Sequence, residues 1–419
     1  MLDHAGDCGC DRLKQDLMPL DAAISLALEQ VRPVGDIEIL PLQDCAGRFA
    51  AAPAYAHFAM PLFDNSAMDG FAVATADCET TLSLPISGTV AAGDAPARLT
   101  AGTAMRIYTG APLPEGADAV NMSERCDATN RLVTLHQAPA PGENIHRAGS
   151  DQATGAMLVD KGQRIGARHA GLLAGNGITT CHVRRKVRVG VFSTGNELAQ
   201  GALQLGQIHD ANRPMLLSLA VQAGSDVTDL GVLPDDLEQT TQALKAVRDR
   251  FDLVLSTGAV SVGGRDHMRA ALLDAGGTLD GWRVAIKPGK PVAFGRLGST
   301  AFTGLPGNPF AAYVGFHLFA GPQIARLSGA GNRPFAPHPA RAVFDWRRKP
   351  GRAEVFPVRL RGFTDQGVAE LERLGASVSA TLFPLADADG LAIIPAEIGH
   401  VAPGDRIRWQ PFDGNGDMR

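Results

Sequence analysis

The chain has 419 residues, of which 45% are hydrophobic and 20% charged, and its formal net charge is -5 at pH 7. This composition is typical of a soluble globular protein rather than a disordered one, and the length predicts about two to four domains. The negative charge argues against nucleic acid as the main partner, because binding to a phosphate backbone normally needs a basic excess.

The 6 cysteines are scattered apart from Cys8 and Cys10, and none lies in a Cys-x-x-Cys motif. Two thiols without nearby histidines are too few ligands for zinc, so we expect neither a metal nor a redox role for this pair. The first residues lack an apolar signal core, and no stretch of about 18 apolar residues could cross a membrane. We therefore expect a protein of the reducing cytoplasm that has no membrane partner.

The first predicted element is an amphipathic helix, because Leu20, Ile24, Leu28 and Val31 fall on one helical face. Short apolar runs separated by Gly, Pro and Asp follow from about residue 57 to 145, for example at 104–108 and 131–135. These runs predict a small β-rich domain.

From Val187 strands and helices alternate. The expected elements are a strand at 187–192, a helix that Asn212 caps and that runs to Ala223, a strand at 226–232, a helix at 235–248, a strand at 251–255 and a helix near 266–275. This alternation predicts a parallel, doubly wound sheet, in which ligands bind beyond the carboxyl ends of the strands. The loops 193–197, 256–266 and 303–308 should therefore be neighbours.

Helix signals stop after Gly331, and alternating segments at 354–360, 391–394 and 406–409 predict a small C-terminal β-barrel or sandwich. Two short basic runs, Arg184-Arg185-Lys186 and Arg347-Arg348-Lys349, are interpreted as solvated faces or strand flanks.

Two tight glycine turns are stiffened by proline, at Lys287-Pro288-Gly289-Lys290-Pro291 and at Leu305-Pro306-Gly307-Asn308-Pro309. Glycine lets backbone N–H groups approach an anion, proline fixes φ, and the two lysines add positive charge. Together the turns predict a phosphate or oxyanion site, although either one alone could be an ordinary connection.

The segment Phe63-Asp64-Asn65-Ser66-Ala67-Met68-Asp69-Gly70, which we call the octapeptide, is unusually rich in polar ligand groups. Its carboxylates, amide and hydroxyl indicate a functional site. The alternative is an Asx-type turn followed by a capped segment, because Asp, Asn and Ser often bond their own backbone.

With these motifs the chain resembles the molybdopterin molybdenumtransferase family, which includes the bacterial MoeA proteins and the gephyrin E domain. The resemblance spans nearly the full length. It rests on the octapeptide, Thr109-Gly110-Ala111-Pro112-Leu113-Pro114, Ser193-Thr194-Gly195 with Glu197-Leu198, Val260-Ser261-Val262-Gly263 and the two glycine-proline turns, which occur in the order that the family has them.

The resemblance implies a multidomain fold of α/β and β parts. It comprises an N-terminal helix and linking segment at 1–56, a small β-rich domain at 57–146, the return of the elongated linking domain at 147–186, a MogA-like α/β molybdopterin-binding domain at 187–330 and a C-terminal β-barrel at 331–414. It also implies a homodimer, with the active site where the octapeptide region of one subunit meets the doubly wound domain of the other.

The activity that the resemblance implies is insertion of molybdate-derived molybdenum into adenylylated molybdopterin, with Mg²⁺-dependent release of AMP, to give molybdenum cofactor. Asp69, Glu197 and Asp266 match the family's acidic positions, as catalytic residues and as ligands of hydrated Mg²⁺. Lysine and arginine suit anion binding. The positions matched to molybdate are Lys287, Lys290, Arg352 and Ser379.

Further positions are expected to contact the substrate. They are Thr109, Asp151, Ser193, Thr194, Gly195, Gly258, Ser261, Gly263, Lys287, Lys290, Pro306, Gly307, Asn308 and Pro309, with Gly304 as a further close-approach glycine. Simpler roles stay open for some of these residues. Arg352 could be a surface arginine, Glu197 and Asp266 could only complement helix starts, and the glycines could serve strand-to-helix packing.

The chain departs from the family pattern at several positions. Asn196 stands where aspartate is usual, Ala259 where a second glycine is common, and Arg283 where lysine is frequent. Arg265 and His267 flank Asp266, where acidic and aromatic residues are frequent, and this alters the charge beside a proposed metal ligand. We interpret His267 as a helix-surface residue rather than a ligand.

Two other functions stay open at this point. A molybdopterin adenylyltransferase has a single domain similar to residues 187–330, but it would not need the octapeptide or the C-terminal domain. A non-enzymatic scaffold or binding paralogue is the other alternative, which the retained acids and lysines disfavour.

Overall fold

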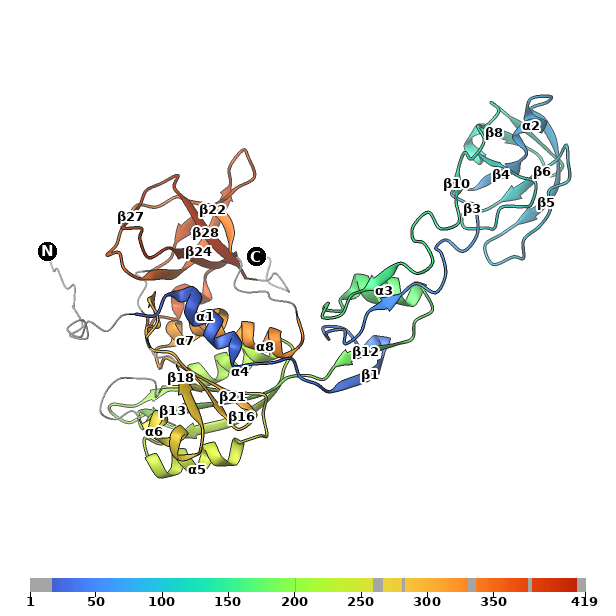
Figure 1. The fold of residues 1–419 in the computed structure, drawn as a ribbon. Helices are drawn as coiled ribbons and strands as arrows, with labels where there is room; N and C mark the ends of the chain where they lie inside the picture. Colours follow the sequence, from blue (N-terminus) through green and yellow to red (C-terminus); the bar gives the residue numbers. More distant parts are fainter. Residues whose placement is uncertain are drawn as a thin grey trace.

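The computed structural model describes residues 17–199, 201–258, 267–280, 283–330, 337–375 and 379–412. The molecule is elongated: an α/β domain and a β-barrel lie side by side, and a narrow linking domain carries a small β domain at the far end (Figure 1). Within the described ranges, no helix has the length and apolar character needed to cross a membrane.

The α/β domain is built on a six-stranded sheet with the order β16-β13-β17-β21-β20-β18. The first four strands are parallel, whereas β20 is antiparallel to both of its neighbours. The strands are β13 (Arg188–Thr194), β16 (Asp226–Leu233), β17 (Leu253–Thr257), β18 (Thr278–Asp280), β20 (Ala293–Leu297) and β21 (Thr300–Leu305). β17 and β21 are buried throughout, as expected for parallel strands covered on both faces.

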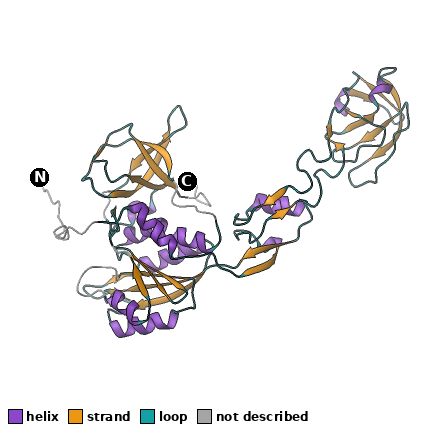
Figure 2. Ribbon diagram, in the orientation of Figure 1, coloured by secondary structure: helices purple, strands orange, loops and turns teal. Residues whose placement is uncertain are grey.

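Helices cover both faces of this sheet (Figure 2). One face packs with α1 (Leu20–Glu29), α4 (Asn212–Gln222), α7 (Pro309–Gly315), the π-helical segment η4 (Phe316–Ala320) and α8 (Gly321–Leu327). The other face packs with α5 (Leu237–Val247) and α6 (His267–Asp274). Side chains alternate accordingly, because Val191 joins the first core and Phe192 the second. The predicted doubly wound sheet is confirmed.

The C-terminal domain is a closed barrel. Its strands are β22 (His338–Ala342), β24 (Ala353–Phe363), β25 (Ala369–Arg373), β26 (Gly390–Ile394) and β28 (Arg406–Pro411), and pairing of β24 with β26 closes it. Short pieces complete it: β23 (Trp346–Arg347), β27 (His400–Val401) and a one-turn helix α9 (Phe383–Ala386) that the sequence did not predict. The barrel prediction is confirmed. β19 (Ile286–Lys287) comes from the α/β domain and pairs with β24, so it joins the two domains.

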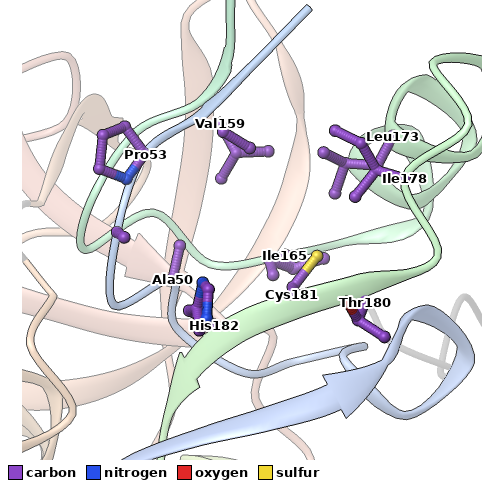
Figure 3. Close-up of a pocket in the computed structure, with 11 residues that line it drawn as sticks. Ala50, Pro53, Val159, Ile165, Leu173, Ile178, Thr180, Cys181 and His182 are labelled. Carbon is purple, nitrogen blue, oxygen red and sulfur yellow. The ribbon is translucent and has the colours of Figure 1, made fainter. Parts of the chain in front are cut away.

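The linking domain is made by two separate segments of the chain. β1 (Ile37–Pro41) pairs with β12 (Thr180–Arg184), and β2 (Ala54–Tyr55) pairs with β11 (Met157–Val159). The 3-10 turn η2 (Leu42–Asp44) and α3 (Ala167–Gly175) complete it. A mostly apolar pocket lies inside this domain, lined among others by Ile165, Leu173 and Cys181 (Figure 3).

The small β domain holds a six-stranded sheet with the order β7-β4-β6-β5-β9-β8. Its elements are β4 (Gly70–Val73), α2 (Thr75–Cys78), β5 (Ser83–Val90), β6 (Ala104–Ile107), β7 (Ala119–Met122), η3 (Ser123–Arg125), β8 (Cys126–Ala128) and β9 (Leu132–Leu135). Gly70 has to be glycine, because a Cβ atom there would lie 2.0 Å from the carbonyl oxygen of Asn121.

A two-stranded neck, in which β3 (Asn65–Ser66) pairs with β10 (Ile145–His146), joins the small β domain to the linking domain. Asp64 holds the neck closed, since its carboxylate accepts hydrogen bonds from the Ala148 N–H at 2.8 Å and from Arg147 Nη1 at 2.6 Å. The Ala148 bond, with the charge of Arg147, keeps the pKa of the Asp64 carboxyl below its ordinary value even though partial burial opposes this.

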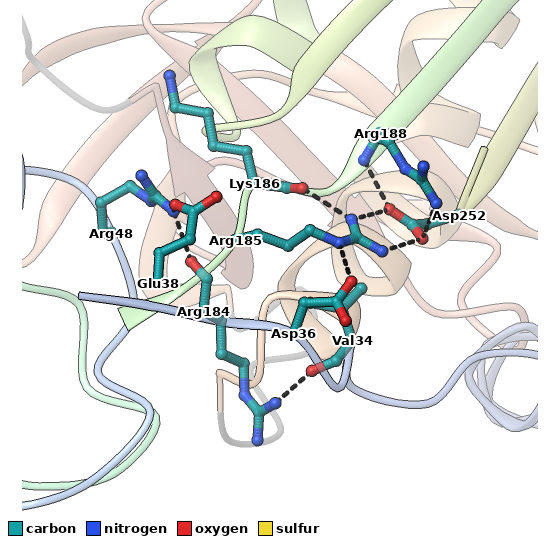
Figure 4. Close-up of polar contacts among 9 residues, drawn as sticks. All are labelled: Val34, Asp36, Glu38, Arg48, Arg184, Arg185, Lys186, Arg188 and Asp252. Carbon is teal, nitrogen blue, oxygen red and sulfur yellow. Dashed lines mark hydrogen bonds and ion pairs between the residues drawn. The ribbon is translucent and has the colours of Figure 1, made fainter. Parts of the chain in front are cut away.

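The junction between the linking domain and the sheet is fixed by Arg185 (Figure 4). Its guanidinium donates to both carboxylate oxygens of Asp252, at 2.6 and 2.8 Å, and its Nε donates to Asp36 at 2.6 Å. The Arg185 side chain is only 18% exposed. The run Arg184-Arg185-Lys186 does flank β12, but the interpretation as a solvated face is wrong for its central residue, because a paired arginine can be buried at a junction.

Asp252→Asn should destabilise this junction. Burial raises the pKa of the Asp252 carboxyl, but the bonds from Arg185 and the Arg188 N–H outweigh it, and the pKa lies below its usual 3.8. We expect a loss of about 2 kcal/mol at neutral pH, less than for a fully buried pair because Arg185 is partly exposed. The carboxylate stabilises the fold above its ordinary pKa, so the difference from wild type should shrink as the pH falls through the lowered folded-state pKa.

Urea denaturation followed by circular dichroism at pH 7 and pH 3 would measure this loss, and hydrogen exchange of residues 180–188 would locate it. Asp127→Asn is the matched control, since Asp127 contacts His136 with its side chain 84% exposed. Equal stability of the two variants at pH 7 would contradict the role given to the Arg185–Asp252 pair.

Candidate functional site

Three loops meet at the carboxyl edge of the sheet, after β13, β17 and β21. A Cβ atom added at Gly258 would lie 2.2 Å from the carbonyl oxygen of Thr194, and one at Gly307 would lie 3.3 Å from the Cα of Gly258. Gly195 and Gly258 both have positive φ, at 142° and 116°. The predicted convergence of these loops is therefore confirmed for their described residues, and glycine makes the close approach possible. Ala259, Ser261, Gly263, Arg265 and Asp266 lie outside the described residues.

Buried polar oxygens without a hydrogen-bond partner gather at this edge. In the described part of the chain they include Ser193 Oγ, Ser256 Oγ and Asn212 Oδ1. Buried polar groups in folded proteins almost always have a partner, so unpartnered ones at a strand edge point to a ligand. Ser193 was predicted to contact substrate, whereas Ser256 and Asn212 were not.

Asn212 ties the helix α4 to two of the loops. Its Nδ2 donates to Thr257 Oγ1 at 2.8 Å and to the Gly307 carbonyl at 2.7 Å. The prediction that Asn212 caps α4 is wrong, because Asp210 Oδ1 accepts from the Asn212 and Arg213 N–H groups at 3.1 Å. The Asn212 side chain is thereby free to face the substrate edge.

Glu197 lies over the first loop. Its carboxylate folds back on Gly195, where an added Cβ atom would lie 2.4 Å from Glu197 Oε2. The short strands β14 (Leu198–Ala199) and β15 (Ile208–His209) pair just beyond it. The Glu197 side chain is exposed, so its carboxylate is accessible to a substrate or a cation in solution.

Asp235 is a second carboxylate of this loop that sequence reasoning missed. Asn196 Oδ1 accepts from the Asp235 N–H at 3.1 Å, and the Asn196 N–H donates to Asp235 Oδ2 at 3.3 Å. Its position in the sequence could have indicated this carboxylate, because Asp235 follows the end of the parallel strand β16 and so belongs to the same sheet edge. These two bonds tie the loop after β13 to the loop after β16.

The two glycine-proline turns pack against each other and against the barrel. A Cβ atom at Gly289 would lie 3.7 Å from Pro306 Cγ and 3.5 Å from the Ala311 carbonyl oxygen. Asn308 Nδ2 donates to Ser379 Oγ at 2.9 Å, and the Ser379 carbonyl accepts from the Phe310 N–H at 3.0 Å. Pro309 begins α7. The structure therefore brings both turns together with Ser379.

Lys287 is anchored by the barrel. Its Nζ lies 3.0 Å from Glu354 Oε1, and the side chain remains 44% exposed. Lys290, on the far side of Gly289, is half-buried and bonds Val284 through its backbone carbonyl at 2.8 Å. Arg352 immediately precedes β24, the strand that pairs with Lys287. Three of the residues matched to molybdate thus lie on adjoining segments.

Arg348 gives a second correction to the basic runs. Its side chain is 3% exposed and its Nε donates to Glu354 Oε2 at 3.0 Å. Arg348 does flank the strand β23, but the interpretation of Arg347-Arg348-Lys349 as a solvated face is wrong for Arg348, because a buried carboxylate takes up its charge.

The octapeptide uses its polar groups in two ways. Asn65 and Ser66 bond their own backbone, as the turn alternative expected, through Asn65 Nδ2 to the Phe63 carbonyl at 3.2 Å and Ser66 Oγ to the Met68 carbonyl at 2.5 Å. Asp64 and Asp69 bond other segments instead. Asp69 Oδ1 accepts from the Thr109 N–H at 2.8 Å and the Thr109 hydroxyl at 2.9 Å.

These bonds keep Asp69 ionised. The Thr109 N–H, followed by its hydroxyl, holds the pKa of the Asp69 carboxyl below its ordinary value. The side chain is exposed, so an anionic carboxylate oxygen is available to solvent or to a cation. Thr109 and Asp69, matched separately in the sequence, therefore form one unit.

One chain alone does not assemble the predicted acidic trio. Asp69 and Thr109 lie in the small β domain, far from the α/β domain that carries Glu197, and Asp151 lies exposed at the neck (Figure 1). Asp266 is outside the described residues, and within those residues no group of three His, Cys, Asp or Glu side chains could hold a metal ion. The apolar pocket of Figure 3 belongs to the linking domain and contains none of the predicted site residues.

Comparisons with known proteins agree along the whole chain. Family models match at residues 18–177 (MoeA N-terminal region, domain I and II), 190–326 (Probable molybdopterin binding domain) and 339–412 (MoeA C-terminal region, domain IV). A molybdopterin molybdenumtransferase of Haemophilus influenzae is 36% identical over 95% of this chain and 99% of its own length. Molybdopterin molybdenumtransferase 2 of Mycobacterium tuberculosis is 33% identical over 88% and 93%.

Solved structures lead to the same fold. The MoeA protein of Pyrococcus horikoshii superimposes with a TM-score of 0.80 at 26% identity, over 95% of this chain and 100% of that one, and a second structure has a TM-score of 0.76 at 30% identity. Similarity of sequence and of structure extends over nearly the full length, so the chain belongs to the molybdopterin molybdenumtransferase family of enzymes.

Proposed function

We propose that this chain inserts molybdenum from molybdate into adenylylated molybdopterin, with Mg²⁺-dependent release of AMP, to give molybdenum cofactor. Family membership supports the activity, and one observation carries its assignment to this site: the two rigid glycine-proline turns, Lys287 and Ser379 converge beside the glycine loops of the sheet edge. Such a surface combines backbone donors and cations for a guest with several negative charges.

The sheet edge would hold the pterin and its phosphates. Gly195, Gly258 and Gly307 allow the backbone to approach the substrate closely, and Ser193, Ser256 and Asn212 offer buried oxygens that have no partner within the described residues. Since Asn212 also bonds the Gly307 carbonyl, it would couple the shape of that loop to helix α4.

Molybdate would bind between the lysine turn and the barrel. Lys287 and Lys290 flank Gly289, and Arg352 and Ser379 come from the barrel side of the same junction. Lysine is a compact charge that suits an oxyanion, and arginine can offer two parallel donors. The residues would hold the oxyanion against the pterin so that its transfer becomes effectively intramolecular.

The acids would complete the site across a homodimer. Asp69, Glu197 and Asp266 have the oxygen ligands that Mg²⁺ prefers, and Asp69 is kept anionic by Thr109. Bound Mg²⁺ would neutralise the pyrophosphate charge and so ease the departure of AMP. Because Asp69 lies so far from Glu197 in one chain, we propose that a partner chain supplies it.

A direct assay tests the activity. Purified protein mixed with adenylylated molybdopterin and Mg²⁺ should release AMP when molybdate is added, and little without it, because the bound oxyanion is required for cleavage in the proposed reaction. Chromatography would measure the AMP released with and without molybdate. Activity with molybdopterin and ATP would instead indicate an adenylyltransferase, and no release under any condition would favour a scaffold.

Lys290→Ala should weaken the response to molybdate while binding of the pterin largely persists. Loss of one charged contact to an oxyanion is expected to raise the KM for molybdate about tenfold or more. Lys245→Ala on helix α5 is the control, because Lys245 is exposed and far from the proposed site. An unchanged KM for molybdate in Lys290→Ala would remove this lysine from the mechanism.

A mixing experiment tests the shared site. Asp69→Asn and Glu197→Gln should each abolish most activity alone, because each leaves every site without one acid. Heterodimers formed by co-expression retain one intact site, so a random mixture should recover about a quarter of the wild-type rate. Absence of recovery, with heterodimers demonstrated by differential tagging, would mean that both acids act within one chain.

A further inference from the structure

A buried carboxylate lies directly behind the lysine turn. Glu354, in strand β24 of the barrel, is 2% exposed, and each of its oxygens faces a different cation. Lys287 Nζ lies 3.0 Å from Oε1 and Arg348 Nε lies 3.0 Å from Oε2. The register of β19 with β24 sets this contact, because Lys287 and Glu354 are direct partners in the ladder.

Arg348 is fully engaged inside the barrel. Besides Glu354, its guanidinium donates to the Pro395 carbonyl at 3.0 Å and to the carbonyls of Ile398 and Arg352. The last bond fixes the backbone of Arg352, which is itself matched to molybdate. One buried network therefore holds the side chain of Lys287 and the main chain of Arg352.

The charge of Glu354 also acts on a third cation, Arg373. The Arg373 guanidinium lies 4.1 Å from the ring centroid of Trp346. Burial lowers the pKa of Arg373, and the charge of Glu354 opposes this shift. The charge of Glu354 thus acts on three cations, by contact on Lys287 and Arg348 and electrostatically on Arg373. Arg348 alone would balance Glu354, so the exposed charge of Lys287 is left as a positive surplus at the mouth of the junction.

We propose that Glu354 is a positioning residue that holds Lys287 in the orientation that receives molybdate, and that the Arg348 pair fixes Glu354 for this purpose. The inference rests on the proposed function, since it assigns molybdate to Lys287. A lysine side chain free in solvent has many rotamers, and ordering it beforehand lowers the cost of binding. The contact with the buried Glu354 carboxylate supplies that order, while the 44% exposed Lys287 side chain keeps N–H donors for the oxyanion.

Two substitutions of Glu354 separate its charge from its reach. Glu354→Gln keeps the shape and removes the charge, whereas Glu354→Asp keeps the charge and shortens its reach toward Lys287 and Arg348. We expect both variants to raise the KM for molybdate about tenfold, with the KM for adenylylated molybdopterin within about twofold of wild type. A role limited to barrel stability would change both KM values or neither.

Chemical labelling of lysines tests the geometry without any assay of activity. An ammonium held against a carboxylate is shielded from acylating reagents, so mass spectrometry should find Lys287 labelled several-fold faster in both Glu354 variants than in wild type. Lys290 is the internal reference. Glu372→Gln is the matched control, because Glu372 pairs with Arg361 at 2.9 Å in the same barrel but is 34% exposed.

A double-mutant cycle measures the coupling between Glu354 and Lys287. If Glu354 acts through Lys287, then Glu354→Gln added to Lys287→Ala should raise the KM for molybdate by no further factor. Additive effects would overturn the positioning role, as would unchanged labelling of Lys287 in both variants. Failure of wild-type protein to release AMP would instead contradict the proposed function, and the labelling result would stand independently of it. Should Glu354→Gln not fold, Glu354→Asp carries the same comparisons.

Discussion

Ion pairs at the domain junctions tie separate segments of this molecule together. Arg185 joins the linking strands to the sheet through Asp252, and Lys287 joins the lysine turn to the barrel through Glu354, which Arg348 holds from inside the barrel. The barrel also shares an apolar core with the α/β domain, to which Val355, Leu385 and Leu391 contribute. A planar guanidinium with several donors can bridge separate segments with defined geometry, as Arg185 does between Asp36 and Asp252.

The sheet edge follows from a different constraint, which is backbone proximity. Parallel strands bring their carboxyl ends to one edge, and there the loops after β13 and β17 approach so closely that a Cβ atom at Gly258 would strike the Thr194 carbonyl. Glycine is required for this approach, and beside it the buried oxygens of Ser193 and Ser256 have no hydrogen-bond partner within the described residues. Close packing of these loops therefore requires glycine, and glycine would also let a ligand approach their backbone closely.

Much of this architecture could be predicted from local pattern. The apolar run at 187–192 and the helices after it predicted the doubly wound sheet, and the glycine-proline turns, which were predicted to share one site, do pack together. Contacts between distant segments could not be predicted in this way. A basic triplet such as 347–349 has the same local signal whether its central arginine meets solvent or a buried Glu354. The prediction that Asn212 caps a helix was wrong for the same reason. An asparagine side chain can cap a helix, but it can also bond two separate loops, as Asn212 does.

The elongated shape gives meaning to the position of the octapeptide. Asp69 is prepared as an anion by Thr109, yet in its own chain it lies a domain and a neck away from the lysine turn. Asp64 holds the neck closed, because its carboxylate accepts hydrogen bonds from Ala148 and Arg147. In the proposed homodimer, a carboxylate carried this far from its own α/β domain would serve the neighbouring chain. The two acids of the octapeptide would then have separate roles: Asp64 closes the neck that carries the small β domain, and Asp69 would complete the site of the partner chain.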